Sequence, residues 1–477
     1  MPVQIPPSND VNALANAIHK ATTAGEALEL LPGVHLTKPG VKLTTPIGPK
    51  GLVMRGSKPD ASGQAARIQR PDFSIGTDPR HVIDDNYGIY LIPTPPEPQE
   101  HLGLVFHVHP PLSPKGKPFE FAILQRGDIK IGGFELDCNM GNQRLEGAPK
   151  HAAAHSFMLG FSGASYPFPD GPGGIQRRVF VAFDSVELSD IKLQRGGFAD
   201  DVRSEPGFDP HPPGFFRPNV ANVNISGIAD DPANPRVNGQ GNSIRFGGLA
   251  QRVTVANCDF DSLILEFDED WRIFPGPPGL FQESEWHVTG IQARVISFNA
   301  KGPVQTLSAR DLLARESFTV SSAAGTVVDS RLALRSGDLE YFDLRRFVFE
   351  QCAFKLPENA GAVSGLDMRT KRHTAFSAAF RNCSFLAAPG FQSGQLIRTE
   401  SHSNDATARV TADFENCRYP PDFGTQKFPD THLAILNQQG DYTFLKADLA
   451  AVDIAQAIKA PGAQITDQGA RITYHIP

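Results

Sequence analysis

Four short segments in the second half of the chain share one pattern, in which a strand-like run ends in cysteine and an aromatic residue follows two positions later. The cysteines are 94, 31 and 34 residues apart, and 94 is close to three intervals of about 31. Short β segments that recur at such a period indicate stacked repeat units with one continuous core, a solenoid. We therefore predict that these cysteines are small buried residues that stack from repeat to repeat, with further repeats between the first two. The segments are Asn257-Cys258-Asp259-Phe260, Gln351-Cys352-Ala353-Phe354, Asn382-Cys383-Ser384-Phe385 and Asn416-Cys417-Arg418-Tyr419.

The composition agrees with a solenoid and argues against several other classes. The 477 residues include 44 glycines and 40 prolines, which suits short strands joined by irregular turns. No cysteine lies in a CxxC pair or near histidine at metal-ligand spacing, so we predict neither a zinc site nor a disulfide framework. The net charge of −7 without a basic stripe argues against a nucleic-acid partner, and no run of 18 apolar residues is present to span a membrane.

The N-terminus lacks a charged region followed by an apolar run. Two locations therefore stay open. Either the protein is secreted or periplasmic and its signal peptide is absent from this chain, or the protein is cytoplasmic.

The N-terminal segment predicts a helix followed by two strands. Asp10 can cap a helix over residues 11–24, whose apolar residues recur at helical spacing, and Gly25 stops it. A strand, the turn Pro32-Gly33 and a second strand follow. The stretch from Asn9 to Val34 resembles the opening of the pectate-lyase-like superfamily of right-handed parallel β-helices, in which a short amphipathic helix caps the end of the solenoid.

This resemblance implies an all-β fold, a right-handed single-stranded parallel β-helix with an N-terminal capping helix. It implies no particular activity, because lyases, hydrolases, epimerases, transferases and phage tailspikes share the architecture. The chain has no basic run resembling the catalytic motif of the pectate lyases. Of the polygalacturonase motifs it has only an echo of the aspartate pair, at Asp200 and Asp201.

The domain organisation follows from strands with alternating apolar residues, which can be traced from residues 129–131 to 410–414. We predict one β-helix domain over residues 1–445. Residues 446–477 predict a short helix and a strand that cap the other end, because an open end would expose unpaired edge strands. Long loops are predicted at 71–117, 138–178, 198–219 and 268–285, and such loops commonly carry the functional site.

Acidic residues cluster in the middle of the chain. Alternation turns Leu263 and Leu265 inward and directs the acids that follow outward on one face. An earlier aspartate pair ends a strand one repeat away, so the two groups are expected about 10 Å apart. That spacing is near the upper limit for inverting glycoside hydrolysis; the competing interpretation is a solvated acidic turn. The candidate catalytic residues are Asp200, Asp201, Glu266, Asp268 and Asp270.

Basic and aromatic residues near these acids are candidates for substrate binding. Aromatic side chains in the two mid-chain loops are typical of the walls of a sugar cleft, although they can equally cover the strands beneath. Hydrolysis requires no cofactor, whereas β-elimination of an acidic glycan requires a cation and a base. The acidic stripe could bind Ca²⁺ for that purpose. The candidate residues are Arg203, Arg245, Phe215, Phe216, Trp271, Lys301 and His155.

The sequence thus favours a carbohydrate-active enzyme that cleaves or transfers glycosidic bonds in a poly- or oligosaccharide, with paired carboxylates as general acid and as base or nucleophile. Two alternatives stay open. One is a polysaccharide lyase acting by β-elimination on a uronate-containing glycan, and the other is a non-catalytic glycan-binding or tailspike-like attachment protein. Either role is compatible with a homo-oligomer, a trimer or a dimer.

Overall fold

The chain divides into two compact units, Met1–Ser284 and Glu285–Pro477, in the computed structural model. The prediction of one continuous domain over residues 1–445 stays a prediction. The structure describes residues 1–37, 44–75, 86–97, 105–108, 119–137, 139, 143–145, 156–195, 201–205, 218–230, 243–247, 249–267, 284–300, 305–321, 324–334, 346–355, 364–370, 375–386, 395–401, 409–415, 417–418, 434–438, 441–447, 465–467 and 471–475.

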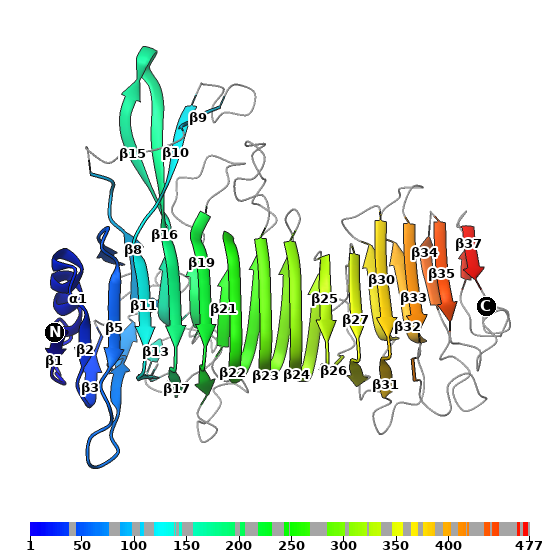
Figure 1. The fold of residues 1–477 in the computed structure, drawn as a ribbon, viewed down its shortest axis with the longest axis horizontal. Coiled ribbons are helices and arrows are strands. Elements are labelled where there is room, and N and C mark those ends of the chain that lie inside the picture. The colour runs from blue at the N-terminus through cyan, green and yellow to red at the C-terminus, as the bar shows by residue number, and fades with distance from the viewer. Residues whose placement is uncertain are drawn as a thin grey trace. The chain divides into compact units, whose positions relative to one another are not determined.

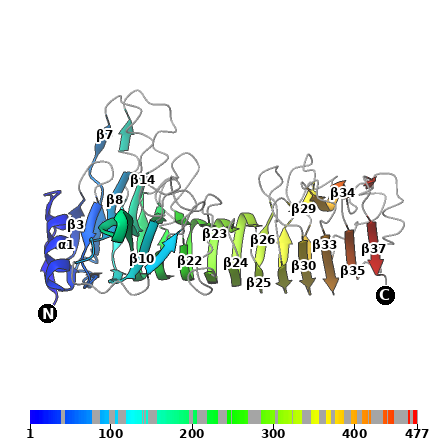
Figure 2. The same cartoon turned by 90° about the horizontal axis from the view of Figure 1, so that it is seen from above.

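The predicted N-terminal helix is present as α1 (Ala13–Ala24), which buries Leu14 and Ile18 against the first strands of the chain (Figure 2). Gly25 ends it in the left-handed conformation, as predicted. The predicted start was wrong by two residues. Asp10 does not cap the helix, because its carboxylate accepts the backbone N–H of Asn12, and Asn12 is the N-cap residue.

The first unit is all-β apart from α1 among its described residues, and most of its strands form three parallel arrays (Figure 1). The first array pairs β1 (Val3–Ile5), β2 (Leu28–Leu30), β5 (Leu52–Gly56), β11 (Asp128–Gly132), the second half of β16 (Ile175–Ser189), β19 (Pro218–Ser226) and the start of β22 (Leu249–Phe267). The second pairs β3 (Gly33–Leu36), β6 (Ala66–Gln69), β12 (Glu135–Asp137), β17 (Lys192–Gln194), β20 (Ala229–Asp230) and Asp259 of β22. The third pairs β4 (Thr44–Ile47), β8 (Asn86–Pro93), β14 (Ser156–Ser162), β18 (Asp201–Glu205), β21 (Ser243–Gly247) and the end of β22.

The order of these strands along the chain is regular. From β2 onward the chain visits the first, second and third arrays in turn, and then returns to the first array beside the strand it left. The segment of β22 from Leu249 to Phe267 visits all three arrays without a break. The core lies between the arrays, because alternate residues of each strand, such as Ile68, Ile131 and Leu263, are buried.

A second, mixed sheet extends from the first unit. It contains β9 (Val105–Val108), β10 (Phe119–Gln125), β15 (Ala164–Gly171) and the first half of β16, and β15 and β16 are joined by the 3₁₀ turn η4 (Pro172–Gly174). Figure 1 shows β15 and β16 extending together beyond the neighbouring strands. The sheet is fastened to the third array, because the hydroxyl of Tyr166 and the guanidinium of Arg126 donate hydrogen bonds to backbone carbonyls at Pro93 and Thr94, at the end of β8.

Three of the predicted loops contain whole strands, so those predictions were wrong in part. Residues 71–117 contain β8, β9 and β7 (Phe73–Ile75), residues 138–178 contain β13 (Gln143–Leu145), β14, β15 and the start of β16, and residues 198–219 contain β18. The proline- and glycine-rich composition of β15 suggested a loop. Pro167 and Pro169 are compatible with a strand here because β15 pairs on one side only, with β16, among the described strands, and an edge strand tolerates proline.

The second unit also consists of parallel strands in its described part. One array pairs β24 (Gln305–Ser321), β25 (Ala324–Val328), β27 (Arg346–Glu350), β30 (Ala375–Arg381), β33 (Arg409–Glu415), β35 (Asp441–Ala447) and β37 (Arg471–His475). In a further array, the end of β24 pairs with β26 (Arg331–Ala333), β26 pairs with β28 (Ala353–Lys355), and β28 pairs with β31 (Ser384–Leu386). A separate sheet pairs β29 (Ser364–Thr370), β32 (Gln395–Ser401), β34 (Ala434–Gln438) and β36 (Ile465–Asp467), and β23 (Ser284–Ala300) opens the unit. Most of the predicted helix at 446–459 lies outside the described residues.

A left-handed residue followed by a buried one recurs in both units. The left-handed residues have φ between 50° and 73° and stand two positions before the next strand segment. The repeat is therefore defined by backbone conformation, and the Asn-Cys segments are only part of it. The left-handed residues are Gly133, Asp190, Gly227, Asn257, Gly290, Asp311, Asp329, Gln351 and Asn382, and the buried residues after them are Phe134, Ile191, Ile228, Cys258, Ile291, Leu312, Ser330, Cys352 and Cys383.

This repeat corrects the predicted period. Three intervals of about 31 residues were expected between Asn257 and Gln351. The left-handed residues between them are Gly290, Asp311 and Asp329, and the last three intervals are 21, 18 and 22 residues. The repeats there are shorter because few residues separate some of the strands, four between β23 and β24 and two between β24 and β25.

The cysteines of this repeat are buried small residues, as predicted. Cys258, Cys352 and Cys383 are buried free thiols, and Cys417 is half-buried. Neighbouring backbones are joined directly, since the N–H that follows Cys383 donates to the carbonyl of Cys352 at 2.9 Å. The hydrogen bond between the Cys383 and Cys352 thiols raises the pKa of Cys383 to about 12. The fifth cysteine, Cys138, lies outside the described residues.

Gln351 offers a test of this backbone repeat. Its φ of 55° is a left-handed conformation that asparagine tolerates better than glutamine, and Asn382 has the same role one repeat later. Gln351→Asn is expected to raise the free energy of unfolding by about 0.5–1 kcal/mol, measured by urea unfolding. The reverse change, Asn382→Gln, is the matched control and should lower it by a similar amount. A Gln351→Asn variant less stable than the wild type would contradict the assigned conformation.

His35 makes stability depend on pH near neutrality. Its side chain on β3 is 2% exposed, and Nε2 donates to the carbonyl of Leu31 at 2.8 Å. Burial lowers the pKa of His35 from its ordinary value of 6.5, against a smaller opposing effect of that hydrogen bond. The unfolded chain therefore binds the proton first as pH falls below 6.5, and stability should decrease towards pH 5.

Urea unfolding of wild type and His35→Gln between pH 7.5 and 5 measures this loss. The variant should show a shallower pH dependence, whereas His19→Gln, at an exposed position of α1, should keep the wild-type slope. Equal slopes for all three proteins would exclude His35 as the titrating group.

Candidate functional site

The third array of the first unit carries the described members of the predicted site. Asp201 and Arg203 lie on β18, Arg245 lies on β21, and Glu266 lies near the end of β22. The three strands pair in parallel, β18 with β21 and β21 with β22. Asp201 was predicted to end a strand and instead begins one, since β17 ends at Gln194.

The register of these strands defines which positions share a face. Val202, Ile244 and Leu263 are level with one another, and Ile244 and Leu263 are buried. Leu265, two positions further along, is also buried, as predicted. Residues between these core positions occupy the alternate register positions of the same strands.

The two predicted arginines are register partners. Arg203 of β18 pairs with Arg245 of β21, and Arg245 pairs with Ile264 of β22. Adjacent strands are about 4.8 Å apart, so two positively charged residues occupy neighbouring positions of one row. On the other side of β18 the partner of Arg203 is Gly160.

A second row, two residues further along, holds a glutamate that the sequence reasoning missed. Ser204 pairs with Phe246, so Glu205 is level with Gly247, and Gly247 pairs with Glu266. Glu205 and Glu266 are thus separated by two strand spacings, about 9.6 Å between Cα atoms. The position between them is a glycine, which has no side chain to fill the space.

The predicted partnership of Asp201 with Glu266 is less favourable in this register. Asp201 is level with Ser243 and Ser262, and Ser262 is four residues before Glu266. With two strand spacings across and four residues along, the Cα atoms are about 16 Å apart. Glu205 therefore lies closer to Glu266 than Asp201 does.

The remaining predicted site residues lie outside the described residues. Their distances from the rows on β18, β21 and β22 are therefore not described. They are Asp200, Asp268, Asp270, Phe215, Phe216, Trp271, Lys301 and His155.

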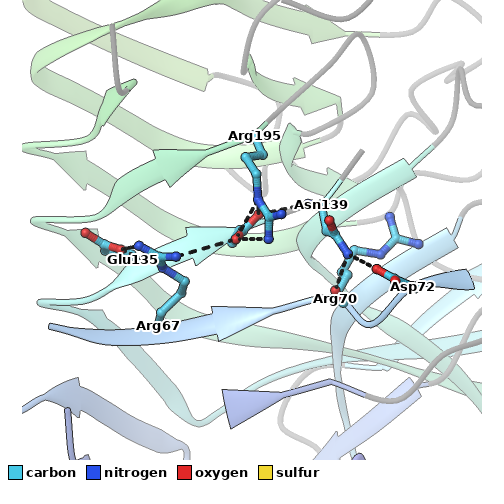
Figure 3. A network of polar contacts seen from close by, with 7 residues as sticks. Arg67, Arg70, Asp72, Glu135, Asn139 and Arg195 are labelled. Carbon is cyan, nitrogen blue, oxygen red and sulfur yellow. Dashed lines mark hydrogen bonds and ion pairs between the residues drawn. The ribbon is translucent and has the colours of Figure 1, made fainter. Parts of the chain in front are cut away.

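Arg195, which directly follows β17, belongs to a polar network on the second array (Figure 3). Asp137, the last residue of β12, is 0% exposed. It accepts hydrogen bonds from Nε of Arg195, at 2.8 and 2.9 Å, and from Nη2 of the same guanidinium. Its Oδ1 also accepts the backbone N–H of Asn139 at 3.0 Å. A buried carboxylate is thereby supplied with charged and neutral donors, as burial of a charge requires.

The network continues on both sides of Asp137. Nη2 of Arg67 lies 2.6 Å from Glu135, and its Nη1 lies 3.9 Å from Asp137. Nδ2 of Asn139 donates to the carbonyl of Arg70 at 3.1 Å and to the carboxylate of Asp72 at 2.8 Å (Figure 3). The residues belong to β6, β12 and β17 or follow these strands within three positions, so the network joins three adjacent strands.

No group of three or more His, Cys, Asp or Glu side chains in the described part of the chain is arranged to hold a metal ion. Asp268 and Asp270, two of the three residues of the acidic stripe considered for Ca²⁺, lie outside the described residues. No helix in the described ranges is long and apolar enough to cross a membrane.

Comparison with protein-family models, with curated proteins and with solved structures finds no match to this chain. The arguments for its function therefore come from the sequence and from the strand register.

Proposed function

We propose that the chain is a right-handed parallel β-helix, similar in architecture to the pectate-lyase-like superfamily, and that it is an enzyme acting on the glycosidic bonds of a polysaccharide. The first part is supported by the order in which the chain visits three parallel arrays and by the usual right-handed sense of parallel crossovers. Each passage through the three arrays is one coil, and α1 caps the first. Secretion or a periplasmic location stays a prediction.

The observation that carries the enzymatic proposal is the row Glu205, Gly247 and Glu266. Inverting glycosidases hold two carboxyl groups about 6.5–9.5 Å apart, so that a water and the sugar fit between them. Cα atoms about 9.6 Å apart are compatible with that separation. The missing side chain at Gly247 leaves room for the scissile bond.

The proposed reaction uses the two glutamates in different roles. One carboxylic acid donates its proton to the glycosidic oxygen as the bond from the anomeric carbon breaks. The other, ionised, takes a proton from a water whose oxygen attacks the anomeric carbon from the opposite side. The sugar leaves with inverted configuration, and the two carboxyl groups exchange protonation states before the next turnover.

The arginine row favours an acidic substrate. Arg203 and Arg245 occupy neighbouring positions about two residues from the glutamate row, and guanidinium groups bind carboxylates in a bidentate manner. The same row keeps a second candidate function open, β-elimination of a uronate-containing glycan, in which an arginine neutralises the uronate carboxylate or removes the α-proton.

A polysaccharide panel tests the proposal. Neutral and uronate-containing polysaccharides are incubated with the protein, and the products are analysed by mass spectrometry and by absorbance of unsaturated uronates. Products heavier by one water per cleavage, from acidic substrates only, are expected. Products with new absorbance and no added water would replace hydrolysis by elimination. Binding without any product would support the attachment-protein alternative and overturn the enzymatic proposal.

A further inference from the structure

The contact between Arg195 and Asp137 has features that stability alone does not explain. Arg195 is the last described residue before β18 and follows directly on β17. Its φ is 43°, a left-handed conformation that long side chains seldom adopt and that glycine or asparagine adopts more easily. Such a conformation persists only where the surroundings enforce it.

The enforcing contact is visible in the structure. The guanidinium of Arg195 donates to both oxygens of Asp137, although the arginine side chain itself is 40% exposed. Asp137 is held in turn, because its carbonyl accepts the N–H of Arg70 and its carboxylate accepts the N–H of Asn139. Its strand, β12, is paired on both sides, with β6 and β17. Arg195 is therefore tied to one of the interior strands of the first unit.

The position of this contact in the chain relates it to the site. Five residues separate Arg195 from Asp201, the first residue of β18. Because only these five residues join them, the position of Arg195 limits how far away β18 can begin. A shift of β18 by one residue would turn both Arg203 and Glu205 to the opposite face, because side chains alternate along a strand.

We propose that Arg195 is a positioning residue, whose ion pair with Asp137 fixes the exit from β17 and thereby holds β18 in the register that aligns Glu205 with Gly247 and Glu266. The inference rests on the proposed function for its catalytic consequence. Its structural part, the restraint on β18, is independent of that function.

The test uses Arg195→Gly, which removes the guanidinium and also removes the cost of the left-handed backbone. Hydrogen–deuterium exchange of the peptide containing residues 201–205 is compared with that of peptides from β5 and β11, which do not contain Asp137. We expect exchange in β18 to be at least about 10-fold faster, with exchange in β5 and β11 unchanged. On an acidic polysaccharide that the wild type cleaves, kcat should fall by about 10- to 100-fold with KM nearly unchanged.

Two further variants complete the test. Arg195→Lys keeps the charge but loses the planar set of guanidinium donors. Its exchange rate at 201–205 and its kcat should therefore lie between those of Arg195→Gly and the wild type. Arg67→Gln is the matched control, because Arg67 contacts Glu135 and Asp137 but does not lead into β18. It should leave exchange at 201–205 and kcat as in the wild type.

The outcomes separate the two proposals. Wild-type exchange at 201–205 in Arg195→Gly, or faster exchange throughout the first unit, would overturn the positioning role. A protein in which Glu205→Gln and Glu266→Gln both keep full activity would overturn the proposed site. In that case the exchange measurement still decides whether Arg195 restrains β18.

Discussion

Replacing Glu205 or Glu266 by glutamine is expected to lower kcat on an acidic polysaccharide by about 10²- to 10⁴-fold. Glutamine keeps the size and the hydrogen-bonding capacity of glutamate but can neither donate the acid proton nor accept one from water. Both positions alternate with core residues and are not themselves part of the core row that contains Leu263 and Leu265. The fold and the melting temperature should therefore stay close to those of the wild type.

Asp201→Asn is the variant that discriminates between the two pairings of carboxylates. Asp201 lies on the same strand as Glu205 but is level with Ser262, four residues from Glu266. The Asp201→Asn variant should retain activity within a few-fold of the wild type if Glu205 is the partner of Glu266. Loss of activity in Asp201→Asn together with normal activity in Glu205→Gln would restore the pairing predicted from the sequence.

Replacing Phe380 by alanine is expected to lower the free energy of unfolding of the second unit by about 3–5 kcal/mol. Phe380 is 0% exposed and stacks on Phe349 with ring centroids 5.1 Å apart and planes 8° apart. It also contacts Phe354 and Phe385, whose rings stack on each other at 5.2 Å. Truncation would leave a cavity between rings held by strands that cannot move closer.

Two controls separate the cavity from other effects in urea unfolding. Phe380→Leu keeps most of the buried volume and should cost less than about 1.5 kcal/mol. Leu386→Ala removes an apolar side chain that is 51% exposed and should change stability by less than about 0.5 kcal/mol. If Phe380→Ala costs no more than Leu386→Ala, the aromatic stack contributes little to the core.

The strands could be predicted from the sequence because alternation of apolar residues is a local signal. Ile129 and Ile131, or Leu263 and Leu265, mark buried positions without any knowledge of their neighbours. The full repeat could not be predicted in the same way. Its constant feature is a left-handed residue, and Gly290, Asp311 and Asn382 meet that requirement equally well. Only the copies that combine asparagine or glutamine with cysteine were recognisable.

The candidate site, too, could be predicted from the sequence only in part. Alternation correctly singled out Leu263 and Leu265 as core positions and so drew attention to Glu266. Glu205 gave no such signal. Its alignment with Gly247 and Glu266 depends on how β18 pairs with β21 and β21 with β22, which brings together residues that are far apart in the sequence. A residue that acquires its role through register cannot be found from its own sequence neighbourhood.

The unequal spacing of the left-handed residues also has an evolutionary consequence. Successive positions are 18 residues apart between Asp311 and Asp329 but 57 apart between Gly133 and Asp190, where β15 and the first half of β16 are inserted. The left-handed residue is followed by the next strand segment after the same two positions in both cases, so a longer stretch between two left-handed residues does not change where that segment begins. Segments can therefore be gained, lost or exchanged between these residues with little effect on the stacked strands. A chain built in this way can vary the length and sequence of its insertions while its core stays the same.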